Sequence, residues 1–429
     1  MTTFYLETYG CSLNTADSDL AVGRLTALGH KQTNLEEAAI LIVNTCGVKE
    51  PTEDRIVHRL RQLSKLDLPL IIIGCLPKIS YDRVIDAAPQ YAAILGPQSI
   101  ESLGHIFDRV VSGERGIIHL ESDNGSKLRF YQGPPDTTIC TIPICEGCLG
   151  ACAYCAVRFA RGAVRSHSIN EIVEVVTRSI HLGYHEIRLT SQDAGVFGAD
   201  TGENLVDLLA ALDKLPGEHR FRLGMFNPNL VLDSIDEIAE IMSSTHFFRF
   251  FHVPLQTGSD SLLQAMNRRY TLADWKDIVS RIRSRMPDAT IATDIIVGFP
   301  GESDSDFEQT LDVITEIRPE VVNISKYGDR PNTAASKSKH KVDTQIKKNR
   351  SRKLSRLVET LSHQSNKSWI GWTGFVLVTE PAPRGGTLTR TQSYKPIILK
   401  EPLSPGSYVN IEVISSEQTH LLGEIITAS

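Results

Sequence analysis

Five of the eight cysteines lie within sixteen positions of the chain, and three of these five have a spacing suited to metal chemistry. Cys148, Cys152 and Cys155 form a C-x3-C-x2-C motif directly after a predicted strand. Three thiolates this close on one loop can bind three irons of a cubane [4Fe–4S] cluster and leave the fourth iron without a protein ligand. An open iron allows a cluster to bind a substrate or a cofactor rather than only to carry electrons.

A zinc site is the alternative explanation of these cysteines. Cys145 and Cys148 form one C-x2-C pair, and Cys152 and Cys155 form a second. Only three residues separate the two pairs, whereas the pairs of a zinc ribbon are about 15–20 residues apart. We therefore favour an iron–sulfur cluster, and we expect the extra Cys140 and Cys145 to pack in the interior.

The three remaining cysteines, Cys11, Cys46 and Cys75, each follow a predicted strand and each have a glycine beside them. The carboxyl ends of parallel strands meet at one edge of a sheet, where open α/β sheets bind their ligands. A neighbouring glycine lets the backbone approach a bulky group. Three unrelated buried thiols are the alternative, but their equivalent positions favour a second metal site with these three ligands.

Strands and helices alternate over residues 1–112. The predicted strands are rich in β-branched residues, and the predicted helices have apolar residues at helical spacing. We expect strands at Thr3–Thr8, Ala39–Thr45, Leu70–Gly74 and Ala92–Gly96, and helices at Ala16–Leu28, Thr52–Leu66 and Ile79–Ala87. Continuous apolar strands in such an alternation are typical of a parallel, doubly wound α/β domain. A linker is expected to follow it.

A second and longer alternation covers residues 134–330. Its predicted strands are Ile139–Ile144, Glu186–Ser191, Arg220–Met225, Phe248–Pro254, Thr290–Gly298 and Val321–Lys326. Helical patterns separate them, and six successive βα units predict a partial (βα)6 barrel. Side chains that do chemistry in such a barrel lie at the carboxyl ends of its strands.

The last hundred residues change in character. From residue 326 to residue 367 the chain has 12 basic and 3 acidic residues, although its overall charge is −6. We predict a basic connecting helix over residues 331–363, and a small all-β barrel over residues 364–429, where short strands alternate with Gly and Pro turns. A basic stretch beside such a barrel favours contact with RNA phosphates, and a solvated helix face is the alternative. The candidate RNA-binding residues are Lys347, Lys348, Arg350, Arg352 and Lys353.

The composition is that of an ordinary globular protein. Of the 429 residues, 41% are hydrophobic and 22% are charged, which excludes disordered and fibrous proteins, and the length predicts two to four domains. The longest apolar runs are far shorter than the roughly 20 residues of a membrane span. The N-terminus lacks the pattern of a signal peptide, so we expect a cytoplasmic protein.

The cysteine motif, with Tyr154 before its last cysteine and a βα barrel after it, resembles that of the radical S-adenosylmethionine (SAM) superfamily. The resemblance implies that Cys148, Cys152 and Cys155 hold a [4Fe–4S] cluster whose fourth iron binds the amino and carboxylate groups of SAM. In the superfamily, reduction cleaves SAM to a 5′-deoxyadenosyl radical, and the protein positions and shields that radical.

The N-terminal cysteines narrow the resemblance to the methylthiotransferases. The segments that carry it are Tyr9–Asn14, Asn44–Val48, Gly74–Pro77, Ser191–Asp193, Arg222–Pro228, His252–Ser259, Ala265–Thr271, Asp294–Glu302 and Asp329–Thr333. The family implies an auxiliary [4Fe–4S] cluster on Cys11, Cys46 and Cys75, where a sulfur is methylated before it meets a carbon radical of the substrate. It also implies that the C-terminal barrel is a TRAM module, which binds RNA.

Within the family, the segments Gly147–Gly150 and Phe159–Gly162 resemble most the archaeal and eukaryotic branch. That branch implies methylthiolation at C2 of N6-threonylcarbamoyladenosine (t6A) at position 37, in the anticodon loop of tRNA. Alternatives are isopentenyladenosine at the same position, a protein side chain, or, in another class, a redox-sensing iron–sulfur protein that binds RNA. The reaction implies an electron donor and a sulfur donor, and we expect a monomer without a membrane partner.

SAM also needs polar groups for its carboxylate, ribose and adenine. The resemblance and their positions in predicted strands and strand ends nominate Glu186, Ser191, Gln192, Asp193 and Arg222. Each of them could instead serve a loop or cap a helix. No catalytic residue beyond the six cluster cysteines is predicted.

Overall fold

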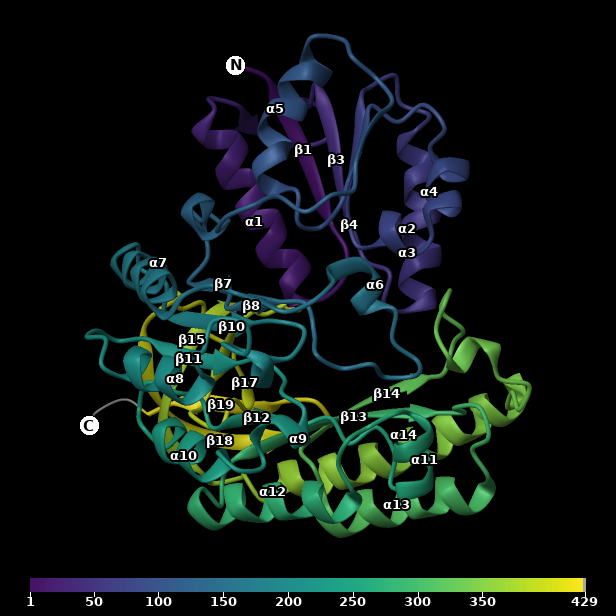
Figure 1. Ribbon diagram of the computed structural model, residues 1–429. Helices are drawn as coiled ribbons and strands as arrows, with labels where there is room; N and C mark the ends of the chain where they lie inside the picture. Colours follow the sequence, from purple (N-terminus) through teal and green to yellow (C-terminus); the bar gives the residue numbers. More distant parts are fainter. Residues whose placement is uncertain (427–429) are drawn as a thin grey trace.

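Six parallel strands form the sheet of the N-terminal domain in the computed structural model, which describes residues 1–426 (Figure 1). Their spatial order is β2-β1-β3-β4-β5-β6. The strands are β1 (Thr3–Thr8), β2 (Lys31–Gln32), β3 (Ile40–Thr45), β4 (Leu70–Gly74), β5 (Ala93–Leu95) and β6 (Ile117–His119). The helices are α1 (Ser12–Ala27), α2 (Glu50–Leu63), α3 (Leu76–Ile79), α4 (Tyr81–Ala87) and α5 (Ile100–Val111).

The residues of the central strand β3 explain why helices cover both faces of this sheet. Ile40 and Ile42 are buried in the core that includes α1 and α5, whereas Leu41 and Val43 are buried in the core that includes α2 and α4. A strand that is apolar on both sides needs a helical layer on each side. The doubly wound fold that the sequence predicts is confirmed, and β6 extends the sheet past residue 112.

Six further parallel strands form the central domain as two three-stranded sheets, which a bridge between Phe221 and Phe247 joins. The strands are β7 (Ile139–Pro143), β10 (Glu186–Thr190), β11 (Arg220–Leu223), β12 (Phe250–His252), β13 (Thr290–Val297) and β14 (Val321–Lys326). The helices are α7 (Ile169–His181), α8 (Leu205–Asp213), α9 (Pro228–Val231), α10 (Ile235–Met242), α11 (Asp260–Ala265), α12 (Leu272–Arg285) and α13 (Asp304–Ile317). The strands are adjacent in chain order, so the predicted partial barrel is confirmed.

A short insertion after β7 carries the cysteine motif. It consists of β8 (Cys145–Glu146), the cysteine loop, α6 (Val157–Arg161) and β9 (Arg165–Ser166), and β9 pairs with β8 in the antiparallel sense. The hairpin therefore fixes both ends of the loop that holds the three cysteines.

Helix α14 (Thr344–Lys367) connects the central domain to a closed barrel of five strands. Their order is β15-β16-β17-β19-β18, and they are β15 (Thr373–Pro381), β16 (Thr387–Arg390), β17 (Pro396–Leu399), β18 (Tyr408–Ser416) and β19 (Leu421–Ile425). The small all-β barrel is confirmed. The connecting helix lies later than the predicted residues 331–363, because a short 3-10 turn and coil precede it.

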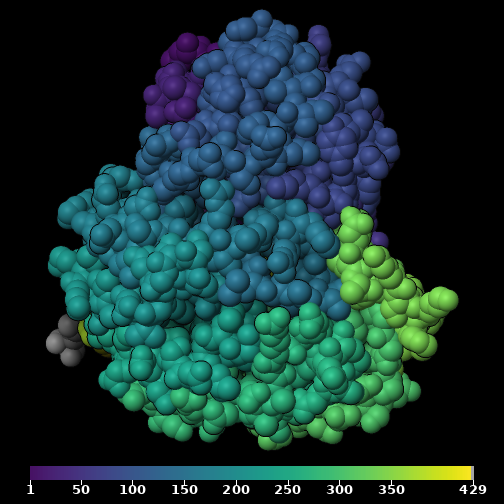
Figure 2. Space-filling model, viewed as in Figure 1, coloured from purple at the N-terminus to yellow at the C-terminus, as the bar shows by residue number. Residues whose placement is uncertain are grey.

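The small barrel docks on the amino ends of the central strands through Tyr394. Its hydroxyl donates a hydrogen bond of 2.6 Å to Glu186, which begins β10, and its ring packs against Phe248 and Phe250. The opposite, carboxyl ends of the central strands face the N-terminal domain, as the 2.6 Å contact between the hydroxyls of Ser12 and Thr190 shows. Figure 2 shows the N-terminal domain, in purple and blue, seated on the teal and green central domain.

No helix within residues 1–426 combines the length and the apolar character needed to cross a membrane.

Candidate cofactor and substrate site

Five of the six cysteines nominated as cluster ligands line one cavity of about 680 Å³ between the N-terminal and central domains, and the sixth, Cys46, is buried. Cys11 and Cys75 come from the carboxyl edge of the N-terminal sheet, and Cys148, Cys152 and Cys155 come from the loop after β8. From the sequence these are two sites on two domains. The fold brings them to the walls of a single space.

The N-terminal set is arranged around the turn that follows β1. A side chain at Gly10, which has φ +124°, would lie only 3.1 Å from the Cys46 sulfur, so glycine makes room for the thiols here. Burial raises the pKa of the Cys46 thiol to about 12, and the nearby Cys11 and Cys75 add to this shift. Buried thiols of this kind are held as thiolates only by strong positive charge such as a metal.

The second set converges around Gly150. A side chain there would lie 3.2 Å from the Cys148 sulfur and 3.6 Å from the Cys152 sulfur, and the Gly150 amide donates a hydrogen bond of 3.2 Å to Cys148. Burial raises the pKa of the Cys155 thiol to about 12, and Cys152 and Cys148 contribute as well. The three sulfurs of the C-x3-C-x2-C motif therefore share one small region of the cavity wall.

In each set, one cysteine sulfur accepts a hydrogen bond from an arginine, and a different arginine serves each set. The Arg161 Nε lies 3.3 Å from the Cys75 sulfur, and the Arg268 Nη1 lies 3.1 Å from the Cys152 sulfur. Net charge and hydrogen bonds to the sulfurs are among the factors that set the reduction potential of an iron–sulfur cluster. Neither arginine was predicted from the sequence as a site residue.

The donor set fits iron–sulfur clusters better than a single ion. A structural zinc needs four donors at one tetrahedral centre, whereas a cubane spreads its thiolates over separate irons. Cys140 and Cys145 are fully buried, as expected for packing residues, and do not line the cavity.

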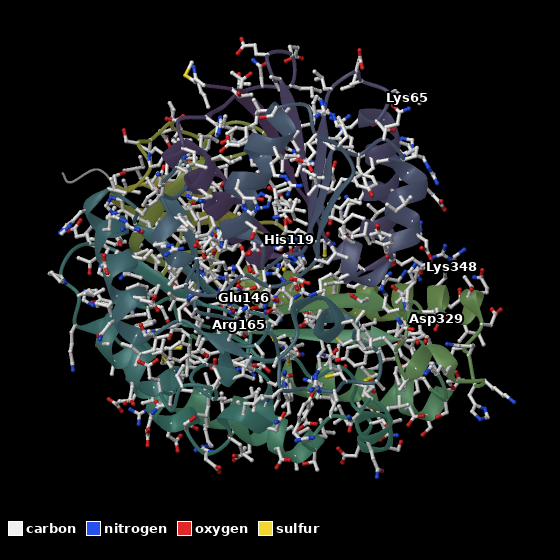
Figure 3. All side chains as sticks on the ribbon, turned by 45° about the horizontal axis from the view of Figure 1, so that its top comes forward. Lys65, His119, Glu146, Arg165, Asp329 and Lys348 are labelled. Atoms are coloured by element: carbon white, nitrogen blue, oxygen red, sulfur yellow. The ribbon has the colours of Figure 1, made fainter. Side chains whose placement is uncertain are left out.

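A buried ion network joins the two domains beside the N-terminal cysteines. Arg161 is 0% exposed and donates to Asp17 of α1 at 2.5 Å and to Glu146 of β8 at 2.9 Å. Lys127 pairs with the same two carboxylates. Although burial raises the pKa of Glu146, Lys127 and Arg161 outweigh it and lower that pKa to about 2. Figure 3 labels Glu146 where the two domains meet.

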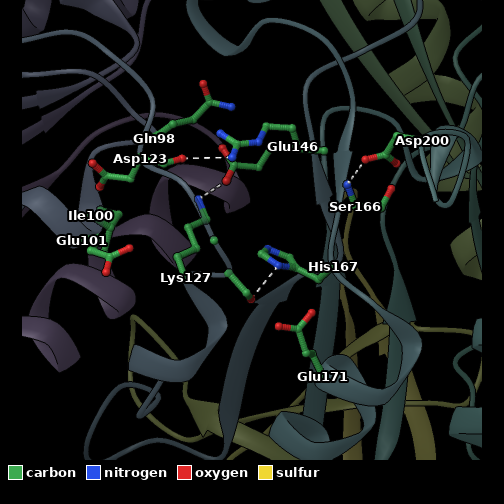
Figure 4. Close-up of a pocket in the computed structure, with 13 residues that line it drawn as sticks. Gln98, Ile100, Glu101, Asp123, Lys127, Glu146, Ser166, His167, Glu171 and Asp200 are labelled. Carbon is green, nitrogen blue, oxygen red and sulfur yellow. Dashed lines mark hydrogen bonds and ion pairs between the residues drawn. The ribbon is translucent and has the colours of Figure 1, made fainter.

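Lys127 and Glu146 also line a second, polar cavity of about 330 Å³ (Figure 4). Its carboxylates already have partners: Glu171 caps α7, and Asp200 accepts from the Ser166 amide. Burial, together with Lys127, lowers the pKa of His167 to about 4, so this ring is neutral at pH 7. The charged groups of this cavity are therefore paired with other protein groups at the junction between the two domains.

Three of the five residues nominated for SAM line the large cavity, namely Ser191, Gln192 and Arg222. Gln192 also accepts a hydrogen bond of 2.8 Å from the Gly147 amide, which supports the cysteine loop. The other two do not line it. Glu186 lies at the amino end of β10 against the small barrel, and Asp193 is fully buried and accepts from the Asn227 amide at 3.1 Å.

The basic helix α14 packs against the central domain more closely than expected. Arg350 is 7% exposed and pairs with Glu302 and Asp304, so it is not available to RNA. Lys353 pairs with Glu308, and the Lys347 amine donates to the Tyr327 carbonyl at 3.2 Å. Of the five residues nominated for RNA, Lys348 and Arg352 are exposed without a protein partner in the described part of the chain.

Comparison with known proteins identifies relatives along the whole chain. Residues 142–314 match the radical SAM superfamily, and residues 3–96 match a family described as "Uncharacterized protein family UPF0004". A Pyrococcus abyssi protein named "Probable threonylcarbamoyladenosine tRNA methylthiotransferase" is 38% identical, with 100% of both chains covered. The human "Threonylcarbamoyladenosine tRNA methylthiotransferase" is 33% identical over 99% of this chain and 74% of its own length.

Solved structures share the fold. TsrM, a radical SAM methyltransferase from Kitasatospora setae, matches with a TM-score of 0.59 and 13% identity over 78% of this chain and 75% of its own. OxsB, a cobalamin-dependent SAM radical enzyme, matches with a TM-score of 0.53 and 10% identity over 84% of this chain and 56% of its own. The matched share of this chain is larger than the central domain alone.

Replacing Arg161 by Leu should destabilise the protein by about 3–5 kcal/mol, because two buried carboxylates would keep only Lys127 as a partner. Urea unfolding of the purified variant measures this. Replacing Arg165, which is exposed on β9, by Leu is the matched control and should change stability by about 0.5 kcal/mol or less. Equal stability of both variants would show that the network does not hold the domains together.

Proposed function

The chain belongs to the family of threonylcarbamoyladenosine tRNA methylthiotransferases, and we propose that it inserts a methylthio group at C2 of t6A at position 37 of tRNA. It is a radical SAM tRNA methylthiotransferase, which uses SAM and [4Fe–4S] clusters. The family membership therefore agrees with the function that the cysteine motifs predict from the sequence. The modified adenosine, its position and the roles of the individual residues are the proposed part.

One observation supports the proposal most: cysteines of both sets, Cys11 and Cys75 from one and all three of the other, line the same cavity. Its volume of about 680 Å³ lies within the range of roughly 300–1,000 Å³ that is usual for small-molecule sites. A nucleoside that is to receive sulfur from one side and lose a hydrogen on the other needs both centres within one enclosed space. The fold provides that space between its two α/β domains.

The roles of the residues follow from their positions. Cys148, Cys152 and Cys155 would hold the cluster that binds SAM, and Cys11, Cys46 and Cys75 would hold the auxiliary cluster. When bound, these groups supply the sulfur, the methyl group and the one-electron chemistry that replace the C2 hydrogen. Ser191, Gln192 and Arg222 would offer polar contacts to SAM from the strand ends.

The remaining cavity walls exclude water and orient the ligands. Tyr154 lines the cavity and packs against Phe299, so its ring forms part of an apolar wall beside the cysteine loop. The His252 Nε2 donates a hydrogen bond of 2.9 Å to the Asp294 carboxylate, so His252 lines the cavity as an oriented, paired histidine. Apolar walls limit the loss of reactive intermediates to solvent.

We further propose that an external electron donor and a sulfur donor serve the reaction, and that the protein works as a cytoplasmic monomer. Isopentenyladenosine in tRNA and a protein side chain are the alternative substrates. A sensor without enzymatic activity is not supported, since the full-length relatives are named as enzymes.

Deleting the gene should remove 2-methylthio-t6A from cellular tRNA and leave t6A in its place. Mass spectrometry of the nucleosides measures both. Wild-type protein should restore the product, whereas a variant with Cys11, Cys46 and Cys75 replaced by Ala should not. If the deletion strain instead lost a methylthiolated isopentenyladenosine, the substrate of the enzyme would be isopentenyladenosine and not t6A.

Anaerobically reconstituted protein should contain about eight irons, four in each cluster. Replacing Cys148, Cys152 and Cys155 by Ala should halve the iron and abolish the cleavage of SAM by dithionite-reduced protein. Cys145→Ala is the matched control within the same loop region and should retain all the iron, because its thiol faces the core. Full iron in the triple variant would contradict the two-cluster assignment.

Three exposed cations of α14, Lys348, Arg352 and Arg356, should contribute to tRNA binding. Replacing them by Gln should weaken affinity and reduce the slope of log affinity against log salt by roughly 0.7–0.9 for each phosphate that the variant no longer neutralises. Binding over a salt series measures the slope. Replacing the exposed Arg55, Arg61 and Lys65 of the N-terminal domain is the matched control; an equal effect in both variants would assign the binding to overall charge.

A further inference from the structure

The charge of the large cavity is unusual for a protein with more acidic than basic residues. Four arginines, Arg158, Arg188, Arg222 and Arg268, belong to its lining, and no Asp or Glu of the described residues does. A recess lined by charge of one sign concentrates ligands of the opposite sign. The lining therefore selects a ligand that carries negative charge.

Three of these four arginines are already engaged. Arg188 donates to Glu186 at 2.6 Å. Arg268 donates to the Cys152 sulfur and to the Asn227 side chain. Arg222 is stacked over two aromatic rings, with its guanidinium carbon 4.6 Å and 4.9 Å from their centres. These three lie where the strands and the cysteine loop form the wall.

Among the described residues, Arg158 has neither a polar partner nor a ring to stack on, whereas Arg222, which also lacks a hydrogen bond there, is held between its two rings. Arg158 lies on α6, three residues after Cys155, and it is exposed. Its guanidinium has no hydrogen-bond or ion-pair partner within residues 1–426, as far as the side chains there are described. Two apolar side chains that also line the cavity are exposed as well, Phe159 at 46% and Val48 at 40%. An unpaired planar cation thus stands beside apolar surface that a flat base can cover.

The chemistry of the purine links this cation to the reaction. In adenine the ring atoms C2 and C6 flank N1, and N6 is bonded to C6, so a base whose C2 points into the cavity brings its N6 substituent along the same wall. In t6A that substituent ends in a carboxylate, whereas an isopentenyl group is uncharged. Arginine binds a carboxylate through two parallel hydrogen bonds.

We infer that Arg158 binds the carboxylate of the threonylcarbamoyl group and thereby selects t6A over adenosines with uncharged N6 substituents. This inference rests on the proposed function, since it names the group of that substrate which the site recognises. A phosphate of the anticodon loop offers similar charge to a guanidinium. The two sources are separated by RNAs that differ only in the modification of adenosine 37.

The experiment uses reconstituted full-length protein and anticodon stem-loop RNAs of one sequence that carry t6A, isopentenyladenosine or adenosine at position 37. Arg158→Gln should weaken binding of the t6A RNA roughly 10- to 100-fold, the usual worth of a hydrogen bond to a charged group. It should leave the affinity for the adenosine RNA unchanged. Arg158→Lys, which retains the charge, should recover part of the affinity for the t6A RNA. Fluorescence anisotropy measures all affinities.

Arg269→Gln is the matched control, because Arg269 is exposed nearby but does not line the cavity; it should bind all three RNAs like the wild type. Iron content and unfolding temperature show whether each variant is intact. Equal weakening of all RNAs by Arg158→Gln would assign the residue to a phosphate and overturn the inference, and so would unchanged binding of the t6A RNA. If wild-type protein methylthiolated the isopentenyladenosine RNA and not the t6A RNA, the proposed function itself would fail.

Discussion

The buried guanidinium of Arg161 connects the two halves of the site. Removing a charge from water costs several kcal/mol, and here one carboxylate from α1, one from β8 and the sulfur of Cys75 compensate that cost. Because these partners come from different elements of two domains, all of them are satisfied only when the N-terminal sheet sits over the partial barrel in one orientation. The two cysteine sets face the same cavity because of that orientation.

The same topological rule places the cysteines in each domain. Both domains are built from parallel strands, and in both the functional residues follow the carboxyl ends. Cys11, Cys46 and Cys75 follow β1, β3 and β4, while Ser191 and Gln192 follow β10. When the two carboxyl edges face one another, the space between them becomes enclosed. The small barrel binds at the other end of the central strands, where Tyr394 meets Glu186, and so lies away from this space.

Local patterns predicted the fold and nominated six cysteines as cluster ligands, because strand alternation and motif spacing are properties of adjacent residues. They could also have excluded two residues that were nominated. Glu186 opens its strand, so in a parallel barrel it lies at the end away from the ligands. Arg350 precedes Leu354 by one helical turn, so helical periodicity places it on the face of α14 that packs inward, although its charge alone favours an exposed position. Arg161 lies in the segment Phe159–Gly162 that carries the family resemblance, but its partners had no local signal, since Cys75 and Asp17 are 86 and 144 residues away.

The cost of removing charge from water also explains why arginine rather than lysine lines the cavity. The site is to hold thiolate ligands and a substrate that is a polyanion, so it needs positive charge at depth in a protein of net charge −6. Burial lowers the pKa of lysine toward neutrality, whereas arginine retains its proton in proteins. The cavity is lined by four arginines and, among the described residues, by no lysine. Lys127 lies outside it, between two carboxylates that keep its charge balanced. The charge of these four guanidinium groups is therefore independent of pH over the physiological range, and substrate selection can depend on where each guanidinium points.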